Sequence, residues 1–154
     1  MTAASYELVF YADAKGREPV AEFIEGLAAH QRAALLAALE VVLAEQGIGV
    51  VGTQHGKALG LGLYEFRLRH THEEIARRFP AAAEAIRAPA GRRQDPVLLR
   101  VFFHPYGRRL ILLLSGYDKG RDDSSGRQER EIARALRCLS DFRASERQKQ
   151  GRRG

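Results

Sequence analysis

Residues 97–121, VLLRVFFHPYGRRLILLLSGYDKGR, decide the fold of this chain. Residues 97–104 and 110–117 are dense in Val, Leu, Ile and Phe, a composition typical of buried strands, and a Pro-Tyr-Gly turn joins them. The two strands should therefore be antiparallel neighbours. Arg100 stands inside the first strand, where a guanidinium is costly without a partner. We expect it to meet either an internal carboxylate or an anionic ligand such as phosphate.

Another strand is predicted from Leu63, where apolar and charged residues alternate. Its apolar face carries Tyr64, Phe66 and Leu68, and its charged face carries Glu65, Arg67 and Arg69. Two arginines in register suit the binding of phosphate groups. The same pattern fits the solvated face of an edge strand, with the arginines paired to Glu65 or Asp118.

The chain before this strand predicts a short first strand and a helical hairpin. Residues 6–11 form the β-type run, and Pro19 suits the first position of a helix. A second helix is expected from about His30 to a stop at Gly47. Residues 47–62 contain six glycines, which predicts a loop rather than regular structure.

Two capping patterns predict the starts of further helices. Thr71 with Glu74 forms a possible capping box at the beginning of residues 71–96, which we interpret as an insertion that returns the chain to the sheet. Ser125 with Gln128 forms the second pattern, ahead of the last helix. The apolar stripe of that helix consists of Ile132, Leu136 and Leu139.

The predicted order is β-α-α-β, insertion, β-β-α, which indicates an α+β fold with helices over one face of a mostly antiparallel sheet. We expect one domain over residues 1–145 and a disordered basic tail over residues 146–154. The other face of the sheet should stay partly open as a basic concavity that suits RNA. Its candidate residues are Lys57, Arg67, Arg69, Arg100 and Lys119.

Composition narrows the class of partner. The chain has 154 residues and a net charge of +6, which comes from residues 99–154 because acidic and basic side chains nearly balance before them. This asymmetry favours a polyanionic partner, nucleic acid before an anionic membrane. Cys138 is the single cysteine, so we expect no disulfide and no cysteine-based zinc site. A cytoplasmic protein without a targeting segment, a membrane span, a metal ion or a cofactor is predicted.

Four motifs in order give this chain a family resemblance. They are an Asp-Ala-Lys-Gly turn followed by PVAEFIEGL, the block HGKALGLGLYEFRLR, the block LLRVFFHPYGRRLILLLSGYDKGR and the helix REIARALR. In this layout the chain resembles the RelE/HigB superfamily of type II toxin–antitoxin ribonucleases, in particular its phage-associated HigB-like branch, along most of residues 6–143. The resemblance implies a microbial-RNase-like sheet, cleavage of mRNA at the ribosome without a metal ion, and a helix-turn-helix, HigA-like antitoxin as partner.

The resemblance also implies roles for individual residues. Arg67 and Arg100 would stabilise the charge that develops on the phosphate, and Lys57 would act as a base or an electrostatic helper. Tyr117 would orient or stack on a base or share in proton transfer, and Lys119 would be an acid or a phosphate contact. The expected RNA-binding residues are Arg69, Arg121 and His55, and His55 is also a second candidate for acid–base work.

Two other functions stay open at this stage. The first is a non-catalytic nucleic-acid-binding module that uses the same basic sheet. The second is a co-repressor that is inert alone and holds a helix-turn-helix protein on its operator. Arginines recur at positions 127, 130, 134 and 137 of the last helix, and they form either a solvated face or a further contact with RNA.

Overall fold

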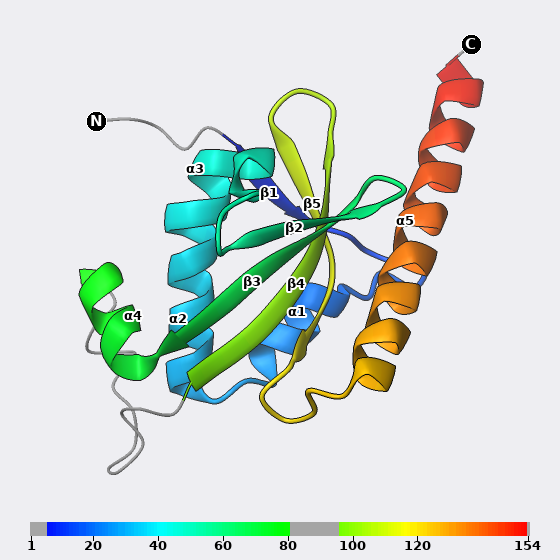
Figure 1. Cartoon of the computed structure of the whole chain (residues 1–154). Helices are drawn as coiled ribbons and strands as arrows, with labels where there is room; N and C mark the ends of the chain where they lie inside the picture. Colours follow the sequence, from blue (N-terminus) through cyan, green and yellow to red (C-terminus); the bar gives the residue numbers. More distant parts are fainter. Residues whose placement is uncertain (1–5, 81–95, 154) are drawn as a thin grey trace.

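The computed structural model describes residues 6–80 and 96–153. In this part of the chain, five strands form one sheet in the order β1-β5-β4-β3-β2 (Figure 1). The strands are β1 (Glu7–Phe10), β2 (Gly56–Gly60), β3 (Leu63–Thr71), β4 (Pro96–Tyr106) and β5 (Leu110–Asp118). Strand β1 runs parallel to β5, and the other neighbouring pairs are antiparallel. The predicted α+β class and the predicted antiparallel pairing of β4 with β5 are confirmed.

The N-terminal helices cover one face of this sheet. They are α1 (Pro19–Glu25) and α2 (Ala29–Ala38), and α2 continues through a π-helical turn (Leu39–Leu43) into α3 (Ala44–Gln46). Gly47 ends the run with a φ of 54°, a conformation that favours glycine. The apolar face of β3 packs against this layer, as the alternating pattern predicted, with Phe66 and Leu68 fully buried.

The stretch Ala29–Val50 contains an 18-residue window with a mean hydropathy of 1.7, so it is long and apolar enough to cross a membrane by length and composition. Half of that window is buried inside the protein, where Leu35 and Leu43 are fully buried. Core helices of soluble proteins have the same composition, so this is weak evidence for a membrane span.

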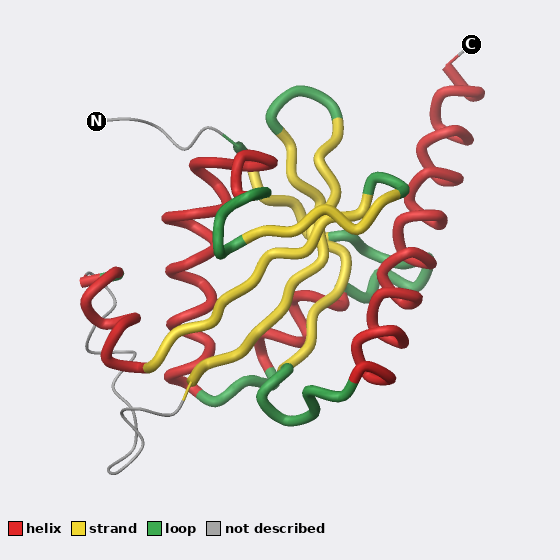
Figure 2. The backbone as a smooth tube through the Cα atoms, in the orientation of Figure 1, coloured by secondary structure: helices red, strands yellow, loops and turns green. Residues whose placement is uncertain are grey.

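The C-terminal helix α5 (Ser125–Arg153) packs on the opposite face of the sheet. Figure 2 shows it as one long uninterrupted helix that runs beside the sheet and projects past it. Its predicted stripe is confirmed at Leu139, which is buried with Phe102 and Leu114 of the sheet. The expectation that helices cover only one face was therefore wrong, because an amphipathic helix of this length needs an apolar surface of its own.

Three local predictions also differ from the structure. The glycine-rich stretch 47–62 contains a 3₁₀ turn (Gly47–Val50) and strand β2, because pairing with β3 offsets the low strand propensity of glycine. The residues expected to form a disordered tail continue α5 as far as Arg153. The cap of α5 comes from Ser124, whose hydroxyl accepts a hydrogen bond from the Arg127 amide at 3.2 Å, rather than from the next serine.

The predicted insertion is only partly described. Its start is confirmed: Thr71 ends β3 and caps α4 (His72–Arg78), and its hydroxyl accepts from the Glu74 amide at 3.1 Å. Residues 81–95, the greater part of the insertion, lie outside the described residues.

Candidate active site

Three of the predicted site residues lie in one row across the sheet. Arg67 of β3 is opposite Arg100 of β4, and Arg100 is opposite Tyr117 of β5. Residues directly opposite each other in neighbouring strands share a face. This is the face on which α5 packs, since Tyr117 belongs to the same apolar cluster as Leu139. The side chains become more buried along the row: Arg67 is 30% exposed, Arg100 is 5% exposed, and the whole Tyr117 residue is 2% exposed.

A buried carboxylate holds the two arginines. Glu65 is fully buried, and its Oε1 lies 2.7 Å from Arg67 Nε and 3.8 Å from Arg100 Nε. The pairing of Arg67 with Glu65 is therefore confirmed, but the buried Glu65 contradicts the solvated face that this alternative assumed. Burial lowers the pKa of Arg100, the Glu65 carboxylate opposes that shift, and a guanidinium stays protonated in proteins. Two guanidiniums that share one carboxylate leave a net positive charge for an anion.

Tyr117 does not line the cavity beside the arginines, and it lines a separate cavity with Arg127 and Arg134 of α5. Its hydroxyl is buried and has no hydrogen-bond partner among the described residues, and the Arg127 guanidinium lies 5.5 Å from the centre of its ring. Burial raises the pKa of Tyr117, so the phenol stays neutral. In this position Tyr117 supports the row through packing, and a direct contact of Tyr117 with RNA stays a prediction.

A cavity of about 400 Å³ opens beside the arginines. It lies where the pairing of β2 with β3 ends at Gly56, which leaves the adjoining edge of β3 uncovered. The residues that line it are Gln54, His55, Arg67, Arg69, His70, Glu74 and Arg100. The cavity therefore combines three guanidiniums, a type of group that suits phosphate, with two imidazoles, a type of group that suits proton transfer.

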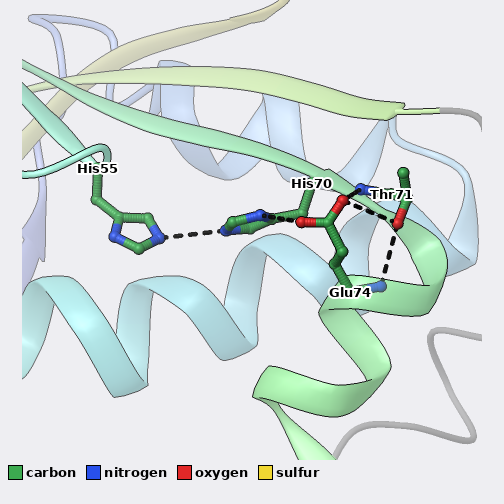
Figure 3. Close-up of polar contacts among 4 residues, drawn as sticks. All are labelled: His55, His70, Thr71 and Glu74. Atoms are coloured by element: carbon green, nitrogen blue, oxygen red, sulfur yellow. Dashed lines mark hydrogen bonds and ion pairs between the residues drawn. The ribbon is translucent and has the colours of Figure 1, made fainter.

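The two histidines form a hydrogen-bonded chain with α4 (Figure 3). His55 Nε2 lies 3.4 Å from His70 Nε2, and His70 Nδ1 lies 3.3 Å from Glu74 Oε2. Both histidines are buried, and His55 also stacks on Phe66 with ring centres 6.1 Å apart. Burial is the main cause that lowers the pKa of each imidazole, so both are neutral near pH 7.

The remaining predicted residues are more scattered. Lys57 is exposed and lies opposite Glu65, so it shares the face of the arginine row. Lys119 and Arg121 follow the end of β5, where Arg121 Nε lies 3.8 Å from Asp118 Oδ2. Neither of these last two residues lines the cavity. The structure thus brings together His55 and the arginines of β3 and β4, with Lys57 on the same face, and leaves Lys119 and Arg121 at another edge.

Sequence reasoning missed Glu65, His70 and Glu74 as members of the site. The alternating pattern puts His70 on the buried face of β3, and the capping box puts Glu74 four residues later, where the two side chains meet. These signals were sufficient for the His70–Glu74 contact. The approach of His55 depends on the register of β2, which the glycine-rich sequence did not reveal. Arg67 N donates to His55 O at 2.8 Å and fixes that register.

Within residues 6–80 and 96–153, no group of three or more His, Cys, Asp or Glu residues is arranged to hold a metal ion. No protein-family model matches the chain, and neither a curated protein nor a solved structure matches it. Any functional conclusion therefore depends on the arginine row, the cavity and the hydrogen-bonded histidines.

Proposed function

We propose that this protein is a toxin of the RelE/HigB type, an endoribonuclease that cleaves mRNA in the cytoplasm without a metal ion. One observation carries the proposal: Arg67 and Arg100 face each other in register on a cavity that two neutral histidines also line. Cleavage of RNA at a ribose needs a clamp for the phosphate charge and a group that accepts the 2′-OH proton. Both kinds of group are available in this cavity.

The clamp is the better defined of the two parts. A guanidinium offers parallel N–H groups that match two phosphate oxygens, and among the described residues Arg67 contacts Glu65 through its Nε. Arg100 Nε has no hydrogen-bond partner among the described residues, although Glu65 lies 3.8 Å away. Glu65 positions both arginines, which keeps the clamp ordered before RNA binds. Lys57 adds positive charge on the same face.

The RelE-like fold assignment and the partners belong to the same proposal. A mixed five-stranded sheet with a C-terminal helix is compatible with that fold. We expect translating ribosomes to present the mRNA, and a helix-turn-helix antitoxin to neutralise the protein. A short reading frame for such an antitoxin should adjoin the gene, and its co-expression should restore growth.

The decisive experiment is inducible expression of the full chain in a bacterial host. We expect wild type to arrest growth and to cut transcripts, with cleavage sites mapped by primer extension. Arg67→Ala and Arg100→Ala should each lower cleavage by about 10²–10³-fold, by analogy with the loss of one oxyanion-hole donor. Arg17→Ala is the matched control, because it removes an equally charged but exposed side chain that pairs with Glu22.

Soluble yield and circular dichroism must accompany each variant, since Arg100 is buried. Growth arrest by a folded Arg67→Ala/Arg100→Ala double variant would contradict the proposal. Harmless expression of soluble wild type, combined with salt-dependent RNA binding, would instead support the non-catalytic binding module. Harmless expression without RNA binding would support the co-repressor.

A further inference from the structure

A chain of hydrogen bonds runs from Thr71 and Glu74 through His70 to His55 (Figure 3), and both imidazoles line the cavity with the arginines. At one end, Glu74 Oε1 accepts from the Thr71 amide at 3.3 Å and from the Thr71 hydroxyl at 3.1 Å. Its other oxygen, Oε2, lies 3.3 Å from His70 Nδ1, and His70 Nε2 lies 3.4 Å from His55 Nε2. Each member of the chain is thus held by the one before it.

The positions of the protons in this hydrogen-bonded chain follow from the ionised Glu74 at one end. Thr71 lowers the pKa of Glu74, through the backbone hydrogen bond first, so the carboxylate is ionised and can only accept. His70 must then carry its proton on Nδ1 and donate it to Glu74, which leaves a lone pair on His70 Nε2. His55 must donate its Nε2 proton to that lone pair. The remaining nitrogen, His55 Nδ1, is therefore unprotonated and able to accept a proton.

We propose that His55 is the general base of the RNA cleavage, with His70 and Glu74 as positioning residues that fix its tautomer. The inference rests on the proposed ribonuclease function and names the group that takes the proton. Among the other candidates, Tyr117 has a buried hydroxyl and lies outside the cavity, and Lys57 is exposed and does not line the cavity. His55 lines the cavity beside Arg67 and Arg100 and is held in place on Phe66.

The step balances without a metal ion or another reactant. The ribose 2′-oxygen forms a bond to phosphorus while its proton passes to His55 Nδ1, and the bond between phosphorus and the 5′-oxygen breaks. The products are a 2′,3′-cyclic phosphate and a 5′-hydroxyl, whose proton comes from solvent water. The protonated imidazole then returns its proton to solvent. While His55 is positive, its hydrogen bond to His70 strengthens, because donors in charged groups bind more tightly.

The surroundings of the histidines explain why His55 can be a base at neutral pH. Burial lowers the pKa of His55, and His70 and Arg78 lower it further. Burial and Arg78 also lower the pKa of His70, whereas Glu74 raises it. The cavity adds the cations Arg67, Arg69 and Arg100. Among these groups, Glu74 is the one that favours the protonated form of the histidines. Its removal should therefore lower their pKa and move the acidic limb of the rate profile to lower pH.

The test is single-turnover cleavage of a labelled mRNA on purified ribosomes between pH 5.5 and pH 8.5. His55→Gln should lower the rate by about 10²–10⁴-fold and remove the acidic limb of the profile. Glu74→Gln should cause a smaller loss and shift the limb to lower pH. Glu73→Gln is the matched control, since it removes the same charge from the same helical turn and should leave the limb in place.

A spectroscopic measurement separates this role from a merely structural one. Long-range ¹⁵N–¹H spectra of the folded wild type should report His70 protonated on Nδ1 and His55 protonated on Nε2. The opposite tautomer of either ring would overturn the proposed chain, whatever the kinetics. Cleavage by a folded His55→Gln variant within about threefold of wild type, with the same pH limb, would overturn the base but leave the ribonuclease standing. No cleavage by folded wild type would overturn both.

Discussion

The two ends of one sheet face differ sharply in what they carry. At the end under α5, the strands present Leu63, Phe102 and Leu114, which are buried with Leu139 of the helix. At the other end, β3 and β4 present Arg67, Arg69 and Arg100 around a cavity, and the buried Glu65 lies beside them. On β4, Phe102 and Arg100 are only two residues apart. A single strand therefore changes from core to candidate site within one period of the pleat.

The difference shows where this fold places its polar chemistry. At the apolar end, α5 covers the sheet and completes an apolar cluster. At the open end β2 no longer pairs with β3, and the exposed strand edge gives access to side chains from both faces of the sheet. The arginines approach the cavity from one face and the histidines from the other. We refer to these regions as the covered end and the open end.

The largest expected effect tests the buried charge at the open end. Glu65→Ala leaves Arg100 buried without a carboxylate, so we expect the free energy of unfolding to fall by about 3–5 kcal/mol. Urea denaturation followed by circular dichroism measures the change. Glu40→Ala, at an exposed position, should stay within about 0.5 kcal/mol of wild type. A similarly small effect of Glu65→Ala would mean that the arginines do not depend on this carboxylate.

The second prediction asks whether the covered end only stabilises the fold. Leu139→Ala truncates a buried side chain between α5 and the sheet and should lower the free energy of unfolding by about 2–5 kcal/mol. RNA cleavage per folded molecule should stay unchanged at a temperature well below the unfolding transition. A loss of cleavage in the fully folded variant would show that α5 acts on the site and that the two ends are coupled.

Features of the covered end that depend on hydrophobic periodicity were easier to predict from the sequence than features that depend on tertiary contacts. The covered end was readable in part, because the apolar runs of β4 and β5 and the stripe of α5 are strong periodic patterns. Which face α5 covers was not readable, since periodicity identifies the apolar side of a helix but not its partner. Likewise, the disordered tail was predicted from composition, whereas the residues continue the last helix.

The open end was harder to predict. Arg67 and Arg100 were found because a charge in an alternating or apolar strand is conspicuous, whereas their register across β3 and β4 was seen only in the structure. Glu65 was treated as an incidental partner, because sequence alone does not distinguish a buried carboxylate from a solvated one. His55 and His70 are 15 residues apart, and strand β2 between them is rich in glycine. Their contact therefore required tertiary structure.

The third prediction concerns pH. Burial lowers the pKa of His55, His70 and His104, so the unfolded chain binds more protons than the folded chain below the ordinary histidine pKa of 6.5. Stability should be greatest above pH 6.5 and should fall as the pH drops toward the folded pKa values, by at most about 1.4 kcal/mol per pH unit for each histidine. Urea midpoints at pH 7.5 and pH 5.5 measure this fall.

Histidine substitutions show how much of this pH dependence of stability comes from each end of the sheet face. His104 belongs to the covered end, where its Nδ1 donates to Gly62 O at 2.7 Å, and His55 and His70 belong to the open end. His55→Gln/His70→Gln should remove more of the pH dependence than His104→Gln. Equal effects of the two variants would mean that the open end is no more sensitive to protons than the covered end.

The smallest effect on stability is expected at Arg69, an exposed residue on the rim of the open end. Arg69→Ala should change the free energy of unfolding by no more than about 0.5 kcal/mol. If Arg69 contacts a phosphate, the variant should bind RNA more weakly for all sequences, and the slope of log K against log salt should fall by about one. Arg109 lies at the turn after β4, and Arg109→Ala serves as the control for lost charge. Equal salt slopes for wild type and Arg69→Ala would exclude Arg69 from the RNA contact and confine binding to Arg67 and Arg100 in the interior of the cavity.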